Sequence, residues 1–211
     1  MNATLNPRIS NAYKLCTTVN AFLYKRGIMN FKNTTTHYST ISIALHWLMF
    51  ILIVTVFASI ELRELFDKGT ETRDAFKMWH FMLGLSVLAL VVVRIVMRVL
   101  AGPIPAIQPT PAKWQDALAK LVHIALYVFM LAMPIAGWLI LSMSGKPVPF
   151  FGIELPALAS ENKELGKSIK EIHETVGELG YYLIGFHAAA ALFHHYILAD
   201  NTFKRMLRPK K

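Results

Sequence analysis

Four stretches of this sequence are each long and apolar enough to cross a lipid bilayer. A helix of about 20 apolar residues spans the hydrocarbon core, and the stretches cover residues 41–60, 78–100, 117–143 and 171–199. Because backbone polar groups in lipid must be satisfied within the protein, a helix is the structure expected for each stretch. The sequence therefore predicts an all-α integral membrane protein built as a four-helix bundle.

Basic residues divide unequally between the two ends of such a bundle. Four spans place both termini on one side, and that side holds 14 of the 22 Lys and Arg residues. It carries two acids, Asp116 and Asp200, against 11 on the opposite side. Cytoplasmic segments of membrane proteins are enriched in Lys and Arg. We therefore expect both termini to be cytoplasmic. The membrane topology accounts for the basic charge, so we expect no nucleic-acid partner.

The first 38 residues are basic and have no membrane-spanning pattern. They contain five Lys and Arg residues and no acid. The pair Lys25-Arg26 follows a short apolar patch, which is the reverse of the order in a secretory signal. We expect residues 1–38 to form a flexible tail and residues 39–211 to form the four-helix domain.

Histidines are the polar residues that most need an explanation within the spans. His173 and His187 are 14 residues apart, which on an α-helix is about 21 Å and within about 40° of the same face. His80 begins the second span at the depth of His173. His46 in the first span and His123 in the third lie nearer the depth of His187. Because imidazole is costly to bury in lipid, we interpret these residues as functional.

Two layers of histidines on neighbouring helices suit the ligation of a metal by imidazole. Haem b held by two histidines is the simplest chemistry for that layout. The sequence has one cysteine, Cys16, whereas a cysteine-ligated iron–sulfur cluster needs several. Cys16 also lies outside a C-x-x-C-H motif, which excludes covalently attached c-type haem. We predict two haem b groups about 20 Å apart. Depth alone leaves His46 and His123 as alternative partners of His187.

Other residues of the spans would surround these groups. Arg94 and Arg98 share a helix face near the end of the second span, where they either reach the lipid headgroups or hold carboxylates of a cofactor. Small residues leave room for a flat porphyrin at Gly84, Gly177, Gly180, Gly185 and alanines 188–191.

The spans also carry a family resemblance. Residues 41–50 (ISIALHWLMF), the region of His80, residues 123–138 (HIALYVFMLAMPIAGW) and residues 173–207 (HETVGELGYYLIGFHAAAALFHHYILADNTFKRML) resemble the bacterial cytochrome b-561 family. The resemblance covers about residues 36–211 and is closest to the superoxide oxidase branch. It implies a bacterial inner-membrane protein with an outer haem on His80 and His173 and an inner haem on His46 and His187.

The resemblance also implies an activity, superoxide:ubiquinone oxidoreductase. Superoxide would be oxidised to oxygen at the outer face, and electrons would pass through two haems to ubiquinone beside His194. The family has a positively charged funnel to the outer haem. We expect Lys146 and Arg63 to line it, with Arg73 and Lys77 nearby, although the net negative charge of the outer side restricts attraction to a local patch.

Three further histidines have weaker assignments. The family pattern leaves His123 as a neighbour of the inner haem rather than its ligand. His195 points about 100° away from His194 and would lie at the membrane interface. His37 falls in the tail and would be solvated.

Two other functions fit the same residues. One is a cytochrome b subunit that carries electrons between a docked dehydrogenase or hydrogenase and quinone. The other, which the sequence favours less, is a transporter that uses its histidines for metal ions or protons without haem.

Overall fold

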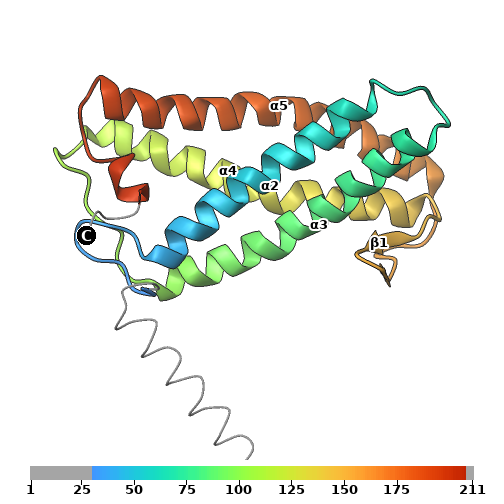
Figure 1. Ribbon diagram of the computed structural model, residues 1–211, viewed down its shortest axis with the longest axis horizontal. Coiled ribbons are helices and arrows are strands. Elements are labelled where there is room, and N and C mark those ends of the chain that lie inside the picture. Colours follow the sequence, from blue (N-terminus) through green and yellow to red (C-terminus); the bar gives the residue numbers. More distant parts are fainter. Residues whose placement is uncertain (1–29, 208–211) are drawn as a thin grey trace, which may run out of the picture.

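The computed structural model describes residues 30–207, and four long helices dominate this part of the chain (Figure 1). They are α2 (Thr40–Arg63), α3 (Glu71–Leu100), α4 (Lys113–Met143) and α5 (Lys163–Tyr196). Each helix is long and apolar enough to cross a membrane. The prediction of an all-helical protein with four membrane-spanning helices is confirmed. Lys25-Arg26, Cys16 and the rest of residues 1–29 lie outside the described part.

Each helix begins several residues before, or ends after, the apolar stretch that predicts it. Polar side chains set three of the starts. Ser39, Thr70 and Asn162 accept hydrogen bonds from the first-turn amides of α2, α3 and α5. Such caps satisfy amides that have no partner within the helix. The helices therefore extend past the apolar stretches, and α5 begins eight residues before its expected span.

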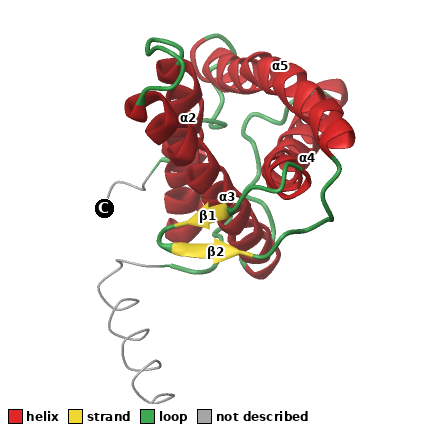
Figure 2. Cartoon of the chain, turned by 90° about the vertical axis from the view of Figure 1, so that its right-hand side faces the viewer, coloured by secondary structure: helices red, strands yellow, loops and turns green. Residues whose placement is uncertain are grey.

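The helices pack in sequence order, α2 along α3, α3 against α4, and α4 against α5. Viewed along the bundle, α2 and α3 lie on one side and α4 and α5 on the other (Figure 2). Met49, Val87, Val91 and Met130 form the buried centre where α2, α3 and α4 meet. Close backbone approaches between α2 and α5 are sparse, so histidines on these two helices face each other across less tightly packed space.

Two short segments and the end of the described chain close one end of the bundle, which we call the tail end. It consists of residues 30–39, 101–112 and 197–207. The amide of Asn33 donates to the carbonyl of Ala101 at 2.9 Å, and that of Gln108 donates to Asn201 Oδ1 at 2.8 Å. The Trp47 indole of α2 donates to the carbonyl of Met206, beside the short 3₁₀ helix η1 (Lys204–Met206). Residues 30–38, which the sequence places in the tail, are thus hydrogen-bonded to the bundle.

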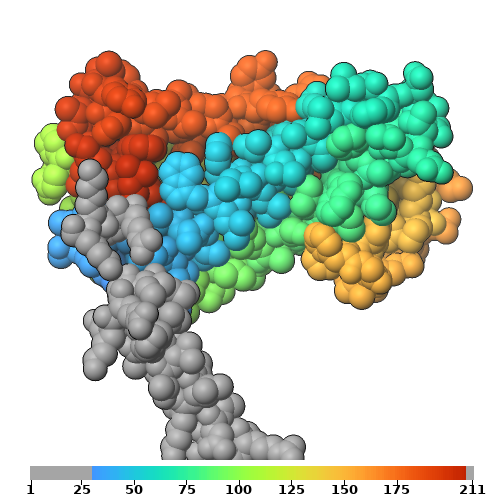
Figure 3. Space-filling model, viewed as in Figure 1, coloured from blue at the N-terminus to red at the C-terminus, as the bar shows by residue number. Residues whose placement is uncertain are grey.

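The opposite end, the hairpin end, consists of residues 64–70 and 144–162. Its antiparallel strands β1 (Val148–Phe150) and β2 (Ile153–Leu155) turn at Phe151 and Gly152, both with positive φ. Val148 is 1% exposed and packs with Leu85 of α3 and Leu141 of α4. The hairpin lies against the beginning of α3 (Figure 3). The buried side chain of Val148 thus anchors the hairpin against α3 and α4.

The outer faces of the helices expose large apolar side chains. Ile51, Val99, Leu121 and Tyr182 each retain 60% or more of their accessible surface. A water-soluble protein rarely exposes so many apolar residues on every helix, whereas lipid tails accept them. These faces are those of a multi-pass membrane protein.

Candidate functional site

Two histidines lie face to face near the hairpin end. His80 of α3 and His173 of α5 have ring centroids 6.3 Å apart and planes at 82°. His80 Nδ1 lies 3.2 Å from the carbonyl oxygen of Val56, to which it donates. The hydrogen of the neutral ring is therefore on Nδ1, and the lone pair of Nε2 is free to bind a metal. Nδ1 of His173 is buried without a hydrogen-bond partner among the described residues.

A second pair lies near the tail end. His46 of α2 and His187 of α5 have ring centroids 6.3 Å apart and planes at 65°. His123 of α4 is closer to His187, with centroids 5.2 Å apart. Nδ1 of His123 lies 2.6 Å from the carbonyl of Ala119 in its own helix. All three histidines thus gather in one layer, as their depths in the sequence predict.

An arginine joins this second layer. Nη2 of Arg94 lies 3.0 Å from His46 Nδ1, and Nη1 is buried without a partner among residues 30–207. None of the ion pairs in the described residues includes Arg94. A guanidinium that faces the interior of a membrane bundle is costly unless an anion accompanies it.

The spacing of both pairs fits one metal between two imidazoles. A metal–imidazole bond is about 2.0–2.1 Å and a ring nitrogen lies about 1.2 Å from its centroid, so rings on opposite sides of one metal have centroids about 6.3 Å apart. Both pairs show this separation. The His123–His187 separation of 5.2 Å is too short for it. The geometry therefore favours His46 over His123 as the partner of His187.

The donor set suits a metal that arrives with other ligands. Within residues 30–207, no group of three or more His, Cys, Asp or Glu side chains could hold a bare metal ion. Two axial imidazoles are enough when a porphyrin supplies the remaining four nitrogens. Added Cβ atoms at Gly84, one turn from His80, and at Gly185, two residues before His187, would meet nothing within 4 Å. The residues present therefore fit haem.

Two other glycines have a different role. An added Cβ at Gly180 would collide with the ring of Phe129, and one at Gly177 would lie 3.6 Å from the side chain of Met133. Phe129 and Met133 belong to α4, so Gly180 allows α4 to approach α5, whereas the contact at Gly177 is at an ordinary van der Waals distance. The expectation that Gly180 leaves room for a porphyrin is wrong, because the sequence does not reveal which helix faces it.

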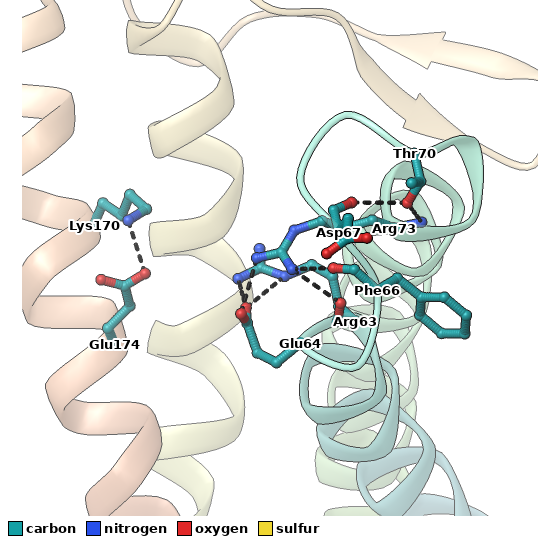
Figure 4. A network of polar contacts seen from close by, with 8 residues as sticks. All are labelled: Arg63, Glu64, Phe66, Asp67, Thr70, Arg73, Lys170 and Glu174. Atoms are coloured by element: carbon teal, nitrogen blue, oxygen red, sulfur yellow. Dashed lines mark hydrogen bonds and ion pairs between the residues drawn. The ribbon is translucent and has the colours of Figure 1, made fainter.

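Arg63, expected at the superoxide site, lies in a network at the hairpin end (Figure 4). Its guanidinium donates to the Glu64 carboxylate, which also accepts from Arg73 at 2.8 Å. The hydrogen bond from Arg63, followed by that from Arg73, holds the pKa of Glu64 below its ordinary value. Arg73 also donates to the carbonyls of Arg63 and Phe66. One carboxylate thus offsets part of the charge of two arginines.

Lys146, the other residue expected at the superoxide site, follows the end of α4. It lines a shallow hollow of about 200 Å³ with Lys77, Phe81 and Asp74. Lys77 is one helical turn before Phe81, which itself follows His80 in the chain. The ammonium groups of Lys77 and Lys146 therefore share a hollow next to the turn of α3 that carries His80.

His194 lies in the last turn of α5, and sequence reasoning missed its main partner. Nδ1 of His194 lies 2.6 Å from Oδ2 of Asp200, a residue that is 4% exposed. The reversal of the chain at Ala199 (φ 53°) brings the carboxylate back to the helix. Sequence spacing predicts contacts along a helix and gives no signal for a pair across its end.

The other two histidines lie apart from these groups. His195 packs against Tyr196 and Phe203, and its Nδ1 is buried without a partner in the described residues. His37 precedes α2 and contacts Thr36 Oγ1 through Nδ1.

Comparisons with known proteins show which family the chain resembles. A family model described as prokaryotic cytochrome b561 matches residues 37–209. The chain is 38% identical over 174 residues to cytochrome b561 homolog 1 of Escherichia coli K12, covering 82% of this chain and 98% of that protein. It is 37% identical over 174 residues to the probable superoxide oxidase CybB of Yersinia pestis, covering 82% and 97%. Cytochrome b561 homolog 2 of Escherichia coli K12 is 30% identical over 187 residues, covering 85% and 95%.

Proposed function

The chain belongs to the prokaryotic cytochrome b561 family, and from that premise we propose that it is a superoxide:ubiquinone oxidoreductase of the bacterial inner membrane. Membership makes it a multi-pass membrane haem protein of electron transport. The proposed reaction converts two superoxide anions, two protons and one ubiquinone into two oxygen molecules and one ubiquinol. The relative named as a probable superoxide oxidase supports this reaction.

The observation that carries the proposal is the equal spacing of the two histidine pairs. His80 and His173 would hold one haem b, and His46 and His187 would hold the other. Each pair has the 6.3 Å separation that a shared iron requires. When bound, haem b supplies an iron that gains and loses one electron at a time, which suits a one-electron donor and a two-electron acceptor.

Arg94 would assist the second pair by binding a carboxylate. Ligation by His46 through Nε2 requires the ring hydrogen on Nδ1, where the guanidinium of Arg94 now donates. Arg94 must therefore leave Nδ1 when haem binds. Haem b carries two propionate carboxylates, and Nη1 of Arg94, which has no partner in the described part of the chain, is a ready donor for one of them.

The charge distribution supports an orientation with the tail end in the cytoplasm. By sequence, 14 of the 22 Lys and Arg residues are assigned to the side of the membrane that holds both termini, and the positive-inside rule places that side in the cytoplasm. His80 and His173 would then lie on the outer side. Superoxide formed outside the cell membrane would meet this pair first, and ubiquinone would be reduced near the inner face.

At the outer side, Lys146 and Arg63 would attract the superoxide anion. Lys146 has the clearer role, because it shares its hollow with a second lysine, Lys77. Arg63 is paired with Glu64, which weakens its attraction for another anion. Two ammonium groups can raise the local concentration of a small anion even where the surrounding side is net negative.

At the inner side, His194 would lie beside ubiquinone and give it a proton. An imidazole gains and loses protons near neutral pH, which suits a quinone oxygen that becomes a hydroxyl. The position of His194, two turns after His187 on α5, places it beyond the inner pair toward the tail end.

Stopped-flow mixing of the purified haem-loaded protein with superoxide tests the proposal. We expect rapid haem reduction by superoxide, followed by reoxidation when a short-chain ubiquinone is present. Haem reduction by ubiquinol without any reaction with superoxide would instead indicate a cytochrome b subunit that serves another dehydrogenase. A colourless protein would indicate a transporter.

A further inference from the structure

A carboxylate returns to the end of α5 after the helix has finished. The helix ends at Tyr196, the chain reverses at Ala199, and the amide of Asp200 donates to the carbonyl of His194 at 3.1 Å. This reversal sets Asp200 Oδ2 2.6 Å from Nδ1 of His194. The two residues are thus joined by a backbone and a side-chain hydrogen bond.

The carboxylate of Asp200 is buried and ionised. The residue is 4% exposed, and its second oxygen, Oδ1, accepts from the amide of Thr202 at 2.8 Å. Burial raises the pKa of Asp200, but the hydrogen bonds from His194 and Thr202 outweigh this effect and hold the pKa below its ordinary value. At neutral pH both oxygens therefore act as acceptors, and neither competes with Nδ1 for the hydrogen.

The loop that carries Asp200 is held firmly in place. The next residue, Asn201, is bound twice to Gln108. Its Oδ1 accepts from the Gln108 amide at 2.8 Å, and its own amide donates to the Gln108 carbonyl at 3.1 Å. Its side-chain Nδ2 also donates to the carbonyl of Ala106. These contacts come from the connection between α3 and α4. Among the described residues that surround Asp200, His194 is the titratable group that acts on its charge.

This geometry selects one form of the His194 ring. With an ionised acceptor on Nδ1, the hydrogen stays on Nδ1 and Nε2 is the nitrogen available to a ligand. The adjacent His195 has no such acceptor, since its Nδ1 is buried without a partner in the described part of the chain. Two neighbouring histidines thus differ in one respect, which is the carboxylate.

We propose that Asp200 is a positioning residue that holds His194 with Nε2 toward the quinone, so that this nitrogen delivers a proton to a quinone oxygen. The inference rests on the proposed reduction of ubiquinone at this end. In each transfer the Nε2–H bond of the imidazolium breaks and an O–H bond to the quinone forms. Water from the cytoplasmic side then restores the proton, and two transfers accompany the two electrons that two superoxide anions provide.

The negative charge of Asp200 also supplies the driving force for reloading His194. A carboxylate against Nδ1 stabilises the imidazolium that must form before each transfer, while Nδ1–H remains in place throughout. The carboxylate itself never needs to be protonated. Its hydrogen bonds from His194 and Thr202 keep it ionised for this task in spite of its burial.

The test compares two steps in the full-length, haem-loaded protein. Asp200→Asn should leave haem content and haem reduction by superoxide unchanged. It should slow ubiquinone reduction about 10- to 100-fold, the range found when the partner of a functional imidazole is removed. Asp200→Glu should restore part of the rate.

Two matched variants separate positioning from a structural role. His195→Gln changes the neighbouring ring and should leave the quinone step unchanged. Asn201→Ala loosens the loop but keeps the carboxylate, and its rate of ubiquinone reduction should stay close to that of the unmodified protein. Equal slowing in Asp200→Asn and Asn201→Ala, or loss of haem from Asp200→Asn, would overturn the inference.

The proposed function and this inference fail in different ways. If the unmodified protein does not pass electrons from superoxide to ubiquinone, the proposed function is wrong. If it does, and Asp200→Asn keeps the same rate of ubiquinone reduction, then Asp200 has no part in proton delivery.

Discussion

The two ends of the bundle hold the same pair of rings in different surroundings. At each end the centroids are 6.3 Å apart. At the hairpin end, His80 donates to a backbone carbonyl, that of Val56, which leaves the ring neutral and rich in electrons. At the tail end, His46 instead faces the guanidinium of Arg94. We therefore expect the equal spacing of the rings to suit the same ligand, haem b, at both ends. We expect the residues beside each pair to determine how strongly its haem holds an electron.

That difference gives a direction to electron flow. Bound to a haem carboxylate, Arg94 would offset a negative charge beside the tail-end haem and so favour its reduced iron, which should raise the midpoint potential there relative to the hairpin end. Electrons supplied at the hairpin end would then move toward the tail end, where the quinone is proposed to bind.

The largest expected effect comes from removing the ligands that α5 shares between both ends. His173→Ala should eliminate the hairpin-end haem and His187→Ala the tail-end haem, because one axial ligand is too few to hold haem b in this arrangement. Total haem per polypeptide should fall by half in each variant, measured from reduced-minus-oxidised spectra and iron content. Either variant with its full haem content would contradict the two-site assignment.

The second prediction concerns the choice between two rings in the tail-end layer. His46→Ala should lose the haem at this end, whereas His123→Ala should keep both haems, because the 5.2 Å approach of His123 to His187 leaves no room for a shared metal. Haem content of the two purified variants gives the answer. The reverse result would make His123 the ligand and His46 its neighbour.

Much of this arrangement follows from sequence periodicity and depth. Apolar length predicts four helices, and the 14-residue spacing of His173 and His187 places one ring in each layer. The assignment of both haems to these rings stays a prediction. The sequence does not decide between His46 and His123, since depth is a single coordinate and the choice depends on how α2 and α4 rotate toward α5.

Features that depend on the folding back of the chain escape sequence reasoning altogether. Asp200 belongs to the connection after α5 and meets His194 through a reversal at one residue with positive φ. The hairpin at residues 148–155 shows no strand pattern in the sequence. Its position depends on Val148, which packs against Leu85 and Leu141. Gly180 looks like space for a cofactor until Phe129 is placed against it.

A smaller effect is expected from the charge that distinguishes the two ends. Arg94→Gln should lower the midpoint potential of the tail-end haem by roughly 40–90 mV, the scale of a unit charge about 8–16 Å away at an effective dielectric constant near 20. Arg94→Lys should keep most of the potential. Redox titration that resolves the two haems measures the shift.

The matched control for Arg94 is Arg98, one turn nearer the end of α3. Arg98→Gln removes the same charge and should shift the potential less, because Arg98 lies one helical turn beyond Arg94, whose guanidinium is the one beside the tail-end pair. If Arg94→Gln shifted only the midpoint potential of the hairpin-end haem, Arg94 would not be the residue that raises the potential at the tail end.

The smallest effect is expected at the hairpin end, where Glu64 holds two arginines. Glu64→Gln removes a negative charge and releases Arg63 and Arg73, so superoxide should react about twofold faster at low ionic strength. The gain should vanish near physiological salt, because exposed charges are screened beyond about 8 Å. Glu174→Gln is the control, because it frees Lys170 on α5 and changes the net charge by the same amount. It should raise the rate of the superoxide reaction less than Glu64→Gln does, because it releases no arginine.

The pH dependence of that variant follows from the direction of the Glu64 pKa. The pKa of Glu64 is lowered from 4.5 in the folded protein. The ion pairs with Arg63 and Arg73 are therefore fully present above pH 4.5. They are lost only as the pH falls through the lower pKa of the folded state. The ratio of rates between Glu64→Gln and the unmodified protein should therefore stay constant from about pH 6 to 8 and approach one in acid. A ratio that changes near neutrality would mean that another group, and not this carboxylate, controls the access of superoxide to the hairpin end.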